Sequence, residues 1–153
     1  MSLSSAPAST LRVALVVSRY HEFVTSRLES GARAVLRDAG VSEPDIVTFH
    51  VPGAYELAQA AHKIAAAGGW DAVVCVGCLI RGETSHFDLI ASATAEGIMR
   101  AAQATGVPIA FGVLTTNTAD EAMARAVDGP ANKGRECAEA ALAMVELYRR
   151  LAR

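Results

Sequence analysis

The sequence lacks long apolar runs, dense basic clusters and glycine-rich nucleotide loops, and each absence excludes a class of protein. No apolar run approaches the ~20 residues that a membrane-spanning helix requires, so we expect no membrane partner. The formal net charge is −2 and the basic residues are dispersed, which argues against nucleic acid as a partner. No G-x-G-x-x-G or Walker loop is present, and His21, His50, His62 and His86 are scattered. We therefore expect no metal site.

The first ten residues offer no targeting signal. Residues 1–10 are rich in Ser and Ala, with no basic start and no continuous apolar segment. We predict a flexible N-terminal tail rather than a signal peptide, and we expect a cytoplasmic location. Residues 11–153 contain no linker and no repeat, so they predict a single domain.

Cysteines are few. There are three, and an odd number in a chain without a signal favours reduced thiols. Cys75 and Cys78 form a C-x-x-C pattern, which can indicate redox chemistry. We disfavour that interpretation because three residues along a strand span ~10 Å, and an odd spacing places the two side chains on opposite faces.

Apolar segments of strand length alternate four times with segments of helical periodicity. Because parallel strands in one sheet are joined by right-handed crossovers, this alternation predicts a three-layer α/β/α sandwich with a parallel sheet. The predicted strands cover residues 12–17, 46–51, 72–76 and 108–114. The predicted helices cover residues 23–39, 57 to the glycines at 68 and 69, 88–105 and 132–151, with a short helix that passes through 125.

Two helical details are specific enough to test. Thr118 is a plausible N-cap of the short helix, and Glu121 three residues later completes a capping box. The other detail is an apolar seam on the last helix, which we expect to contain Cys137, Ala141, Met144, Tyr148 and Leu151.

Polar or glycine-rich segments follow all four predicted strands. The carboxyl ends of parallel strands meet at one edge of the sheet, where open α/β proteins bind ligands. The richest of these segments, residues 77–88, holds two glycines, Thr84, Ser85 and His86, with Asp88 as a nearby partner for the histidine. Backbone N–H groups there can hold an anion and His86 can transfer a proton. An ordinary helix start with structural hydrogen bonds is the alternative.

Other candidate residues each have a structural alternative. Arg125 can reach the same edge as a bidentate phosphate clamp, or it is a solvated surface arginine, and Lys133 is equally compatible with the surface. Glu56 can accept hydrogen bonds from ligand hydroxyls, or it is a first-turn carboxylate of a helix. Tyr20 and Phe111 can stack on a flat heterocycle, although isolated aromatic residues of α/β proteins usually belong to the core.

Taken together, these segments resemble the 6,7-dimethyl-8-ribityllumazine synthase family. The resemblance implies a flavodoxin-like sheet of order 2-1-3-4. It also implies a cofactor-independent transferase of riboflavin biosynthesis, which condenses 5-amino-6-(D-ribitylamino)uracil with 3,4-dihydroxy-2-butanone 4-phosphate and releases phosphate and water. The matching segments are residues 18–21, 51–56, 77–88, 111–116, 121–122 with 125–126, and 132–134.

The resemblance also assigns roles around the pyrimidine substrate. It implies that Tyr20 stacks on the ring, and that His86 donates and accepts protons. His21 stands where Asn is common, at the position that contacts the ribityl chain. The residues that hold the pyrimidine and its ribityl chain, or lie beside it, are Ala54, Tyr55, Glu56, Cys78, Leu79 and Ile80.

The butanone phosphate and the assembly are assigned in the same way. Glu83 and Thr84 offer groups to the butanone phosphate, and Arg125 pairs with its phosphate. Phe111 and Lys133 come from a neighbouring subunit, so the resemblance implies a homopentamer with active sites between subunits. It leaves open a sixty-subunit shell that encloses riboflavin synthase. A non-catalytic carrier of flavin or lumazine, or a cage protein of the same fold, is the alternative function.

Overall fold

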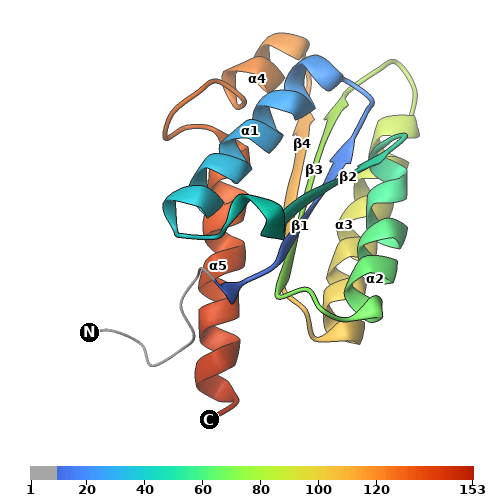
Figure 1. Cartoon of the computed structure of the whole chain (residues 1–153). Helices are drawn as coiled ribbons and strands as arrows, with labels where there is room; N and C mark the ends of the chain where they lie inside the picture. The colour runs from blue at the N-terminus through green and yellow to red at the C-terminus, as the bar shows by residue number, and fades with distance from the viewer. Residues whose placement is uncertain (1–9) are drawn as a thin grey trace.

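A computed structural model describes residues 10–153 and shows a four-stranded parallel sheet between two layers of helices (Figure 1). The strands lie in the order β2-β1-β3-β4, and all three neighbouring pairs are parallel. The predicted sandwich and the strand order 2-1-3-4 are therefore confirmed. The predicted tail lies outside the described residues except for residue 10. The strands are β1 (Val13–Ser18), β2 (Ile46–Val51), β3 (Ala72–Ile80) and β4 (Ile109–Thr116).

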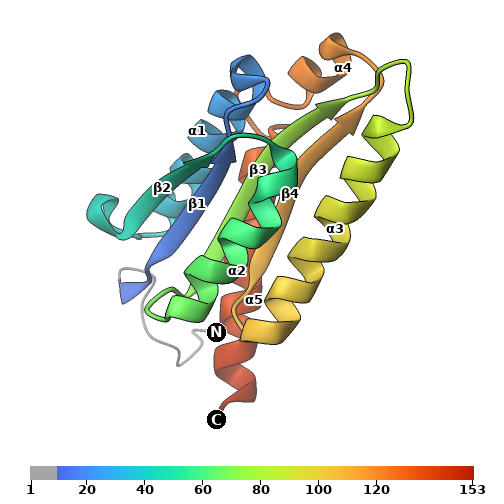
Figure 2. The ribbon, with the colours of Figure 1, turned by 90° about the vertical axis from the view of Figure 1, so that its right-hand side faces the viewer.

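The helices divide between the two faces of the sheet. Figure 2 shows α2 and α3 on one face, whereas α1 and α5 cover the other. No helix among residues 10–153 combines the length and the apolar character needed to cross a membrane. The helices are α1 (Glu22–Asp38), α2 (Leu57–Ala67), α3 (His86–Thr105), α4 (Ala119–Ala124) and α5 (Lys133–Leu151), with 3-10 turns η2 (Glu43–Asp45) and η3 (Ala54–Glu56).

The two central strands are apolar on both faces, because helices cover both faces of a parallel sheet. Every residue of β1 is buried. In β3, Cys75 faces α2 and α3 whereas Cys78 faces α1 and α5, as the odd spacing predicts. Both thiols and that of Cys137 are free and buried. The redox interpretation of the C-x-x-C pattern therefore has no structural support among the described residues.

Two strands run further toward the site than the sequence predicted. β3 continues to Ile80 rather than residue 76, and β4 continues to Thr116 rather than residue 114. The cause is pairing, because Gly77 to Ile80 align with Val113 to Thr116 in register. The first part of the glycine-containing segment is therefore strand, and α3 begins at His86 rather than at residue 88.

The short helix α4 is capped as predicted, with one displacement. The backbone N–H of Glu121 donates to Oγ1 of Thr118 over 3.1 Å. The Glu121 carboxylate accepts from the backbone N–H of Asn117, over 2.8 Å, instead of from Thr118 itself. The first bond satisfies an N–H group that the helix leaves unpaired at its start, and the second ties the residue before the N-cap to the helix.

The predicted seam of α5 is right at two of its five positions. Cys137 and Ala141 are buried, but Met144, Tyr148 and Leu151 are exposed, and Val145 faces the core instead. The lower end of α5 extends past the sheet in Figure 1, so its last turns have no strand to cover. On α3 the buried residues are Thr94, Ile98 and Ala101.

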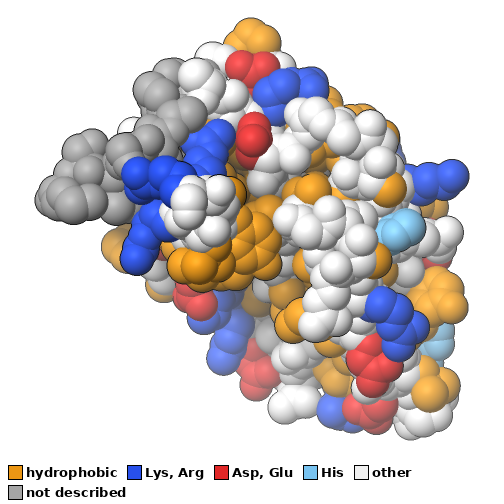
Figure 3. All heavy atoms as spheres, turned by 90° about the horizontal axis from the view of Figure 1, so that it is seen from below, with side chains coloured by type: hydrophobic (Ala, Val, Ile, Leu, Met, Phe, Trp, Pro, Cys, Tyr) orange, Lys and Arg blue, Asp and Glu red, His pale blue; other side chains and the backbone are white. Residues whose placement is uncertain are grey.

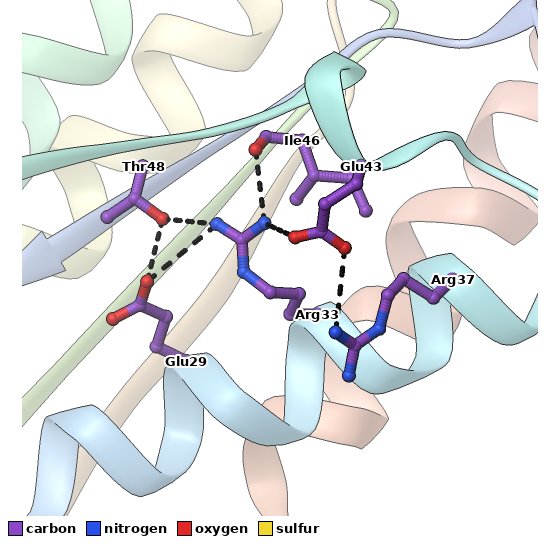
Figure 4. A network of polar contacts seen from close by, with 6 residues as sticks. All are labelled: Glu29, Arg33, Arg37, Glu43, Ile46 and Thr48. Atoms are coloured by element: carbon purple, nitrogen blue, oxygen red, sulfur yellow. Dashed lines mark hydrogen bonds and ion pairs between the residues drawn. The ribbon is translucent and has the colours of Figure 1, made fainter.

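A polar network joins α1 to the edge strand β2 (Figure 4). Arg33 donates to Glu43 over 2.6 Å, to the Ile46 carbonyl over 3.2 Å and to Thr48 over 2.7 Å, and Thr48 donates to Glu29. These bonds fix η2 and the start of β2 against α1. Seen from below, toward the amino ends of the strands, acidic and basic side chains lie interspersed with hydrophobic ones (Figure 3).

Candidate active site

A hollow of about 700 Å³ lies at the carboxyl edge of the sheet, between the ends of β1, β2 and β3 and the start of α3. We call it the His86 hollow. Three segments that are distant in the sequence, residues 20–21, 53–56 and 79–90, meet there because parallel strands end at one edge. The polar segment after β4, which we also expected at this edge, does not line the hollow. Nine of the predicted site residues line it: Tyr20, His21, Ala54, Tyr55, Glu56, Leu79, Ile80, Thr84 and His86.

Two aromatic rings of this hollow are left open. Tyr20 follows β1 and is 66% exposed, and Tyr55 lies in η3 after β2 and is 56% exposed. Burying rings of this size releases substantial free energy, so exposed rings beside a hollow mark a surface that a ligand or another chain covers. The flat walls suit a planar heterocycle.

His86 occupies the first residue of α3 and its imidazole reaches the hollow. Its backbone N–H donates to Oγ1 of Thr84 over 3.3 Å. The predicted partnership with Asp88 is wrong, because side chains two residues apart on a helix do not face each other. Asp88 instead forms an ion pair with Arg81, with Nη2 and Oδ1 3.3 Å apart.

His21 has the only left-handed backbone among the described residues other than glycine, with φ 59° and ψ 49°. It is the N-cap of α1, and its carbonyl accepts from the N–H groups of Val24 and Thr25. Its ring meets the ring of Tyr20 edge-on, with centroids 4.5 Å apart, and lies 5.8 Å from that of Phe23. Partial burial lowers the pKa of His21, which favours a neutral imidazole beside the hollow.

A second hollow, of about 330 Å³, lies between the outer side of β4, the end of α4 and the start of α5. We call it the Lys133 hollow, and Phe111, Arg125, Lys133, Glu136 and Cys137 line it together with other residues of β4. Phe111 is 44% exposed, and Nζ of Lys133 lies 3.0 Å from Oε2 of Glu136. A basic pair beside an exposed ring suits an anionic ligand that carries a flat group.

The two hollows share no lining residue. The sequence predicted that Arg125 and Thr84 would clamp one phosphate, but within one chain Arg125 lines the Lys133 hollow and Thr84 lines the His86 hollow. The cause is the course of the chain after β4. Ala122 and Ala126 are buried in the core cluster that α1 and α5 form with the sheet. Arg125, which lies between them in the sequence, is therefore placed on the same side of the sheet as α1 and α5.

Two predicted residues line neither hollow. Cys78 is 1% exposed and packs in the core beneath α1 and α5, and burial raises the pKa of its thiol to about 11. Its side chain therefore does not face a ligand in the His86 hollow. Glu83 is exposed on the loop before α3 and lies outside both linings.

Sequence reasoning missed several lining residues. Phe87 and Ile90 line the His86 hollow next to His86, and Glu136 and Cys137 line the other. Ile90 follows His86 by one helical turn, and that spacing was the available signal. The Lys133 hollow carried no such signal, because it joins a strand to a helix that begins seventeen residues later.

The described residues contain no group of three or more His, Cys, Asp or Glu placed to hold a metal ion. The fold and the site define a class. The chain is a flavodoxin-like α/β protein with a hollow at the carboxyl edge of its sheet, and the flat walls and the histidine of that hollow suit a small planar ligand.

Comparisons with known proteins give the particular family. Residues 10–149 match the 6,7-dimethyl-8-ribityllumazine synthase family. The chain is 47% identical over 142 residues to a 6,7-dimethyl-8-ribityllumazine synthase from Chlorobium phaeovibrioides (strain DSM 265 / 1930), which covers 93% of this chain and 92% of that relative. The chain therefore belongs to the 6,7-dimethyl-8-ribityllumazine synthase family, and the resemblance seen in the sequence is confirmed.

Proposed function

We propose that the protein condenses 5-amino-6-(D-ribitylamino)uracil with 3,4-dihydroxy-2-butanone 4-phosphate to 6,7-dimethyl-8-ribityllumazine, in riboflavin biosynthesis and without a cofactor. Family membership along almost the whole chain supports this reaction. The observation that carries it is the His86 hollow, which brings a histidine, a threonine and aromatic walls from three segments to one place.

The chemistry requires three things of the site. An amine attacks a ketone to form an imine, so protons must be moved, and the imidazole of His86 is a group that can donate and accept them. Phosphate leaves, so an anion must be held, and Thr84 and Arg125 are the groups for it. Ring closure needs the two reactants held together, and orientation alone can supply ~7–11 kcal/mol of the barrier.

The pyrimidine has a defined place in this proposal. Tyr20 stacks on its ring, and Glu56 with the backbone of Ala54 and Tyr55 accepts and donates hydrogen bonds to the ring and the ribityl hydroxyls. The last residues of β3, Leu79 and Ile80, form the floor. Cys78 contributes no side-chain contact, because its thiol faces the core.

We infer that a complete site needs two chains. His86 and Thr84 lie in one hollow, whereas Phe111, Arg125 and Lys133 lie in the other, so one chain holds two halves of different sites. A ring of chains that contact head to tail brings the His86 hollow of one protomer to the Lys133 hollow of the next. The motif resemblance supports five chains in that ring, which makes Arg125 a residue of the neighbour along with Phe111 and Lys133.

The test is direct synthesis. Purified protein mixed with the two substrates should form lumazine, followed by its fluorescence, and His86→Ala should lower kcat roughly 100-fold while the Kd for the pyrimidine changes little. Arg37→Met serves as the control with unchanged kcat, because Arg37 lies in the last turn of α1 and lines neither hollow. Unmodified protein that binds the pyrimidine and produces no lumazine would establish the carrier function instead.

A further inference from the structure

Arg81 joins the two ends of the loop that leads into the His86 hollow. It follows β3 directly, and its guanidinium reaches forward over the first turn of α3. Nη2 lies 3.3 Å from Oδ1 of Asp88 and Nη1 donates to Oδ2 over 3.4 Å. The guanidinium carbon lies 4.4 Å from the centroid of the Phe87 ring. Residues 82–85, the loop that carries Thr84, lie between these two ends (Figure 2).

The same side chain is also bonded to the end of β4. Nε of Arg81 donates to Oδ1 of Asn117 over 3.2 Å, and its backbone N–H donates to the Thr116 carbonyl over 2.8 Å. The backbone N–H of Asn117 in turn donates to the carboxylate of Glu121. The backbone carbonyl of Glu121 accepts from Nη1 of Arg125. The flat guanidinium thus makes contacts in three directions, which fixes its plane.

These contacts contribute little to stability. The side chains of Arg81 and Asp88 are 47% and 60% exposed, and ion pairs with such exposure contribute almost nothing to the free energy of unfolding. Their geometry is nevertheless specific. A guanidinium can pair with a carboxylate through two nitrogens while its face covers a ring, and a lysine ammonium cannot do both.

We propose that Arg81 is a positioning residue of the reaction, which holds residues 82–85 and the first turn of α3 in the arrangement that the butanone phosphate and His86 require. This inference rests on the proposed function. Phe87 both contacts the guanidinium and lines the His86 hollow, so loss of Arg81 frees a wall of the site along with the loop. The pyrimidine walls at Tyr20, Tyr55 and Glu56 follow β1 and β2, and the partners of the Arg81 side chain are Asn117, Asp88 and Phe87 instead.

The two substrates should therefore respond differently to Arg81→Met. Small displacements of reacting groups reduce rates strongly, so kcat should fall roughly tenfold and KM for the butanone phosphate should rise. The Kd for the pyrimidine should stay within about twofold. Arg37→Met is the matched control, because Arg37 also forms an exposed ion pair, and it should leave all three constants unchanged.

Two further variants separate positioning from simple charge. Arg81→Lys keeps the charge and loses the planar fork, so it should resemble Arg81→Met; recovery of the unmodified constants would overturn the proposal in favour of charge alone. Asp88→Asn and Arg81→Met break the same bridge, so the double variant should lose no more kcat than the worse single one. Additive losses would also overturn it.

The outcomes distinguish this inference from the function on which it rests. Circular dichroism and thermal melting first confirm that each variant is folded. If unmodified protein forms lumazine and the Arg81 variants match it in kcat and in both substrate constants, the positioning role is wrong and the function stands. If unmodified protein forms no lumazine, the proposed function is wrong, and Arg81 loses its role with it.

Discussion

At the scale of single residues, His21 shows the greatest departure from ordinary backbone geometry. Its left-handed conformation suits glycine or asparagine better than a ring-bearing side chain. The conformation places the imidazole edge-on to Tyr20 beside the hollow. Strained residues persist where the surrounding structure holds them, and they gather at functional sites. The site thus carries backbone strain in the segment that presents its most exposed ring.

The pKa of His21 gives a prediction for stability. The folded state holds the pKa of His21 below its ordinary value of 6.5. As the pH falls below about 6.5, the unfolded chain therefore binds more protons at His21 than the folded chain does. The part of the free energy of unfolding that His21 contributes is present above that pH and is lost as the pH falls. His21→Asn removes this contribution. Between pH 7.5 and pH 5.5, the free energy of unfolding measured in urea should fall less for the variant than for the unmodified protein. Equal losses would contradict the shift.

At the scale of elements, α1 and α5 approach each other more closely than either sequence pattern indicated. Asn132, the N-cap of α5, is completely buried against α1, where its amide donates to the carbonyls of Arg27 and Ala126. Gly31 leaves the space for that amide, and Gly134 lets the backbone of α5 reach Leu28. This contact fixes the start of the helix that carries Lys133.

Substitution of Gly134 should therefore destabilise the whole fold. A Cβ at this position would overlap the backbone carbonyl of Leu28, which cannot move without displacing α1. We expect Gly134→Ala to lower the free energy of unfolding by about 2–3 kcal/mol in urea titrations. The added methyl group would meet backbone atoms, and no flexible side chain is there to move aside. Gly82→Ala is the control, because nothing lies within 4 Å of a Cβ there. A similar stability for both variants would show that the helices can separate.

The element scale also shows where sequence reasoning succeeds. Local patterns predicted the four strands, the order of elements and the capping of α4, because each depends on neighbouring residues. They did not predict the burial of Asn132, which needs a glycine a hundred residues earlier. The separation of Arg125 from Thr84 also escaped prediction, because it depends on which face of the sheet α4 covers.

At the scale of the whole molecule, the central feature is the division of the proposed catalytic groups between two hollows. Each isolated chain leaves Tyr20, Tyr55 and Phe111 open to solvent. The ring of chains proposed above would cover these surfaces and complete every site at once, so the proposal makes assembly a condition for activity.

Mixing two inactive variants tests this division. His86→Ala damages one half-site and Arg125→Met the other, so neither alone should form lumazine at the normal rate. Subunits unfolded together and reassembled from an equal mixture should recover about a quarter of the unmodified activity, because one contact in four joins two intact halves. Each variant reassembled alone is the control. No recovery would place both residues in one chain's site.

Light scattering on the same samples gives the number of chains. Five chains of 15.9 kDa have a mass of about 80 kDa, and a sixty-subunit shell has a mass near 950 kDa. Either mass is compatible with complete sites, and a monomer that forms lumazine would contradict the need for two chains.

The buried thiols have a practical consequence. Cys75, Cys78 and Cys137 are at most 8% exposed, and burial raises the pKa of each, so the folded chain presents almost no thiolate at neutral pH. A maleimide dye will therefore not label the native protein. One cysteine introduced on the outer surface of α5 can carry a fluorophore at a single chosen position, and the three native cysteines need not be replaced first.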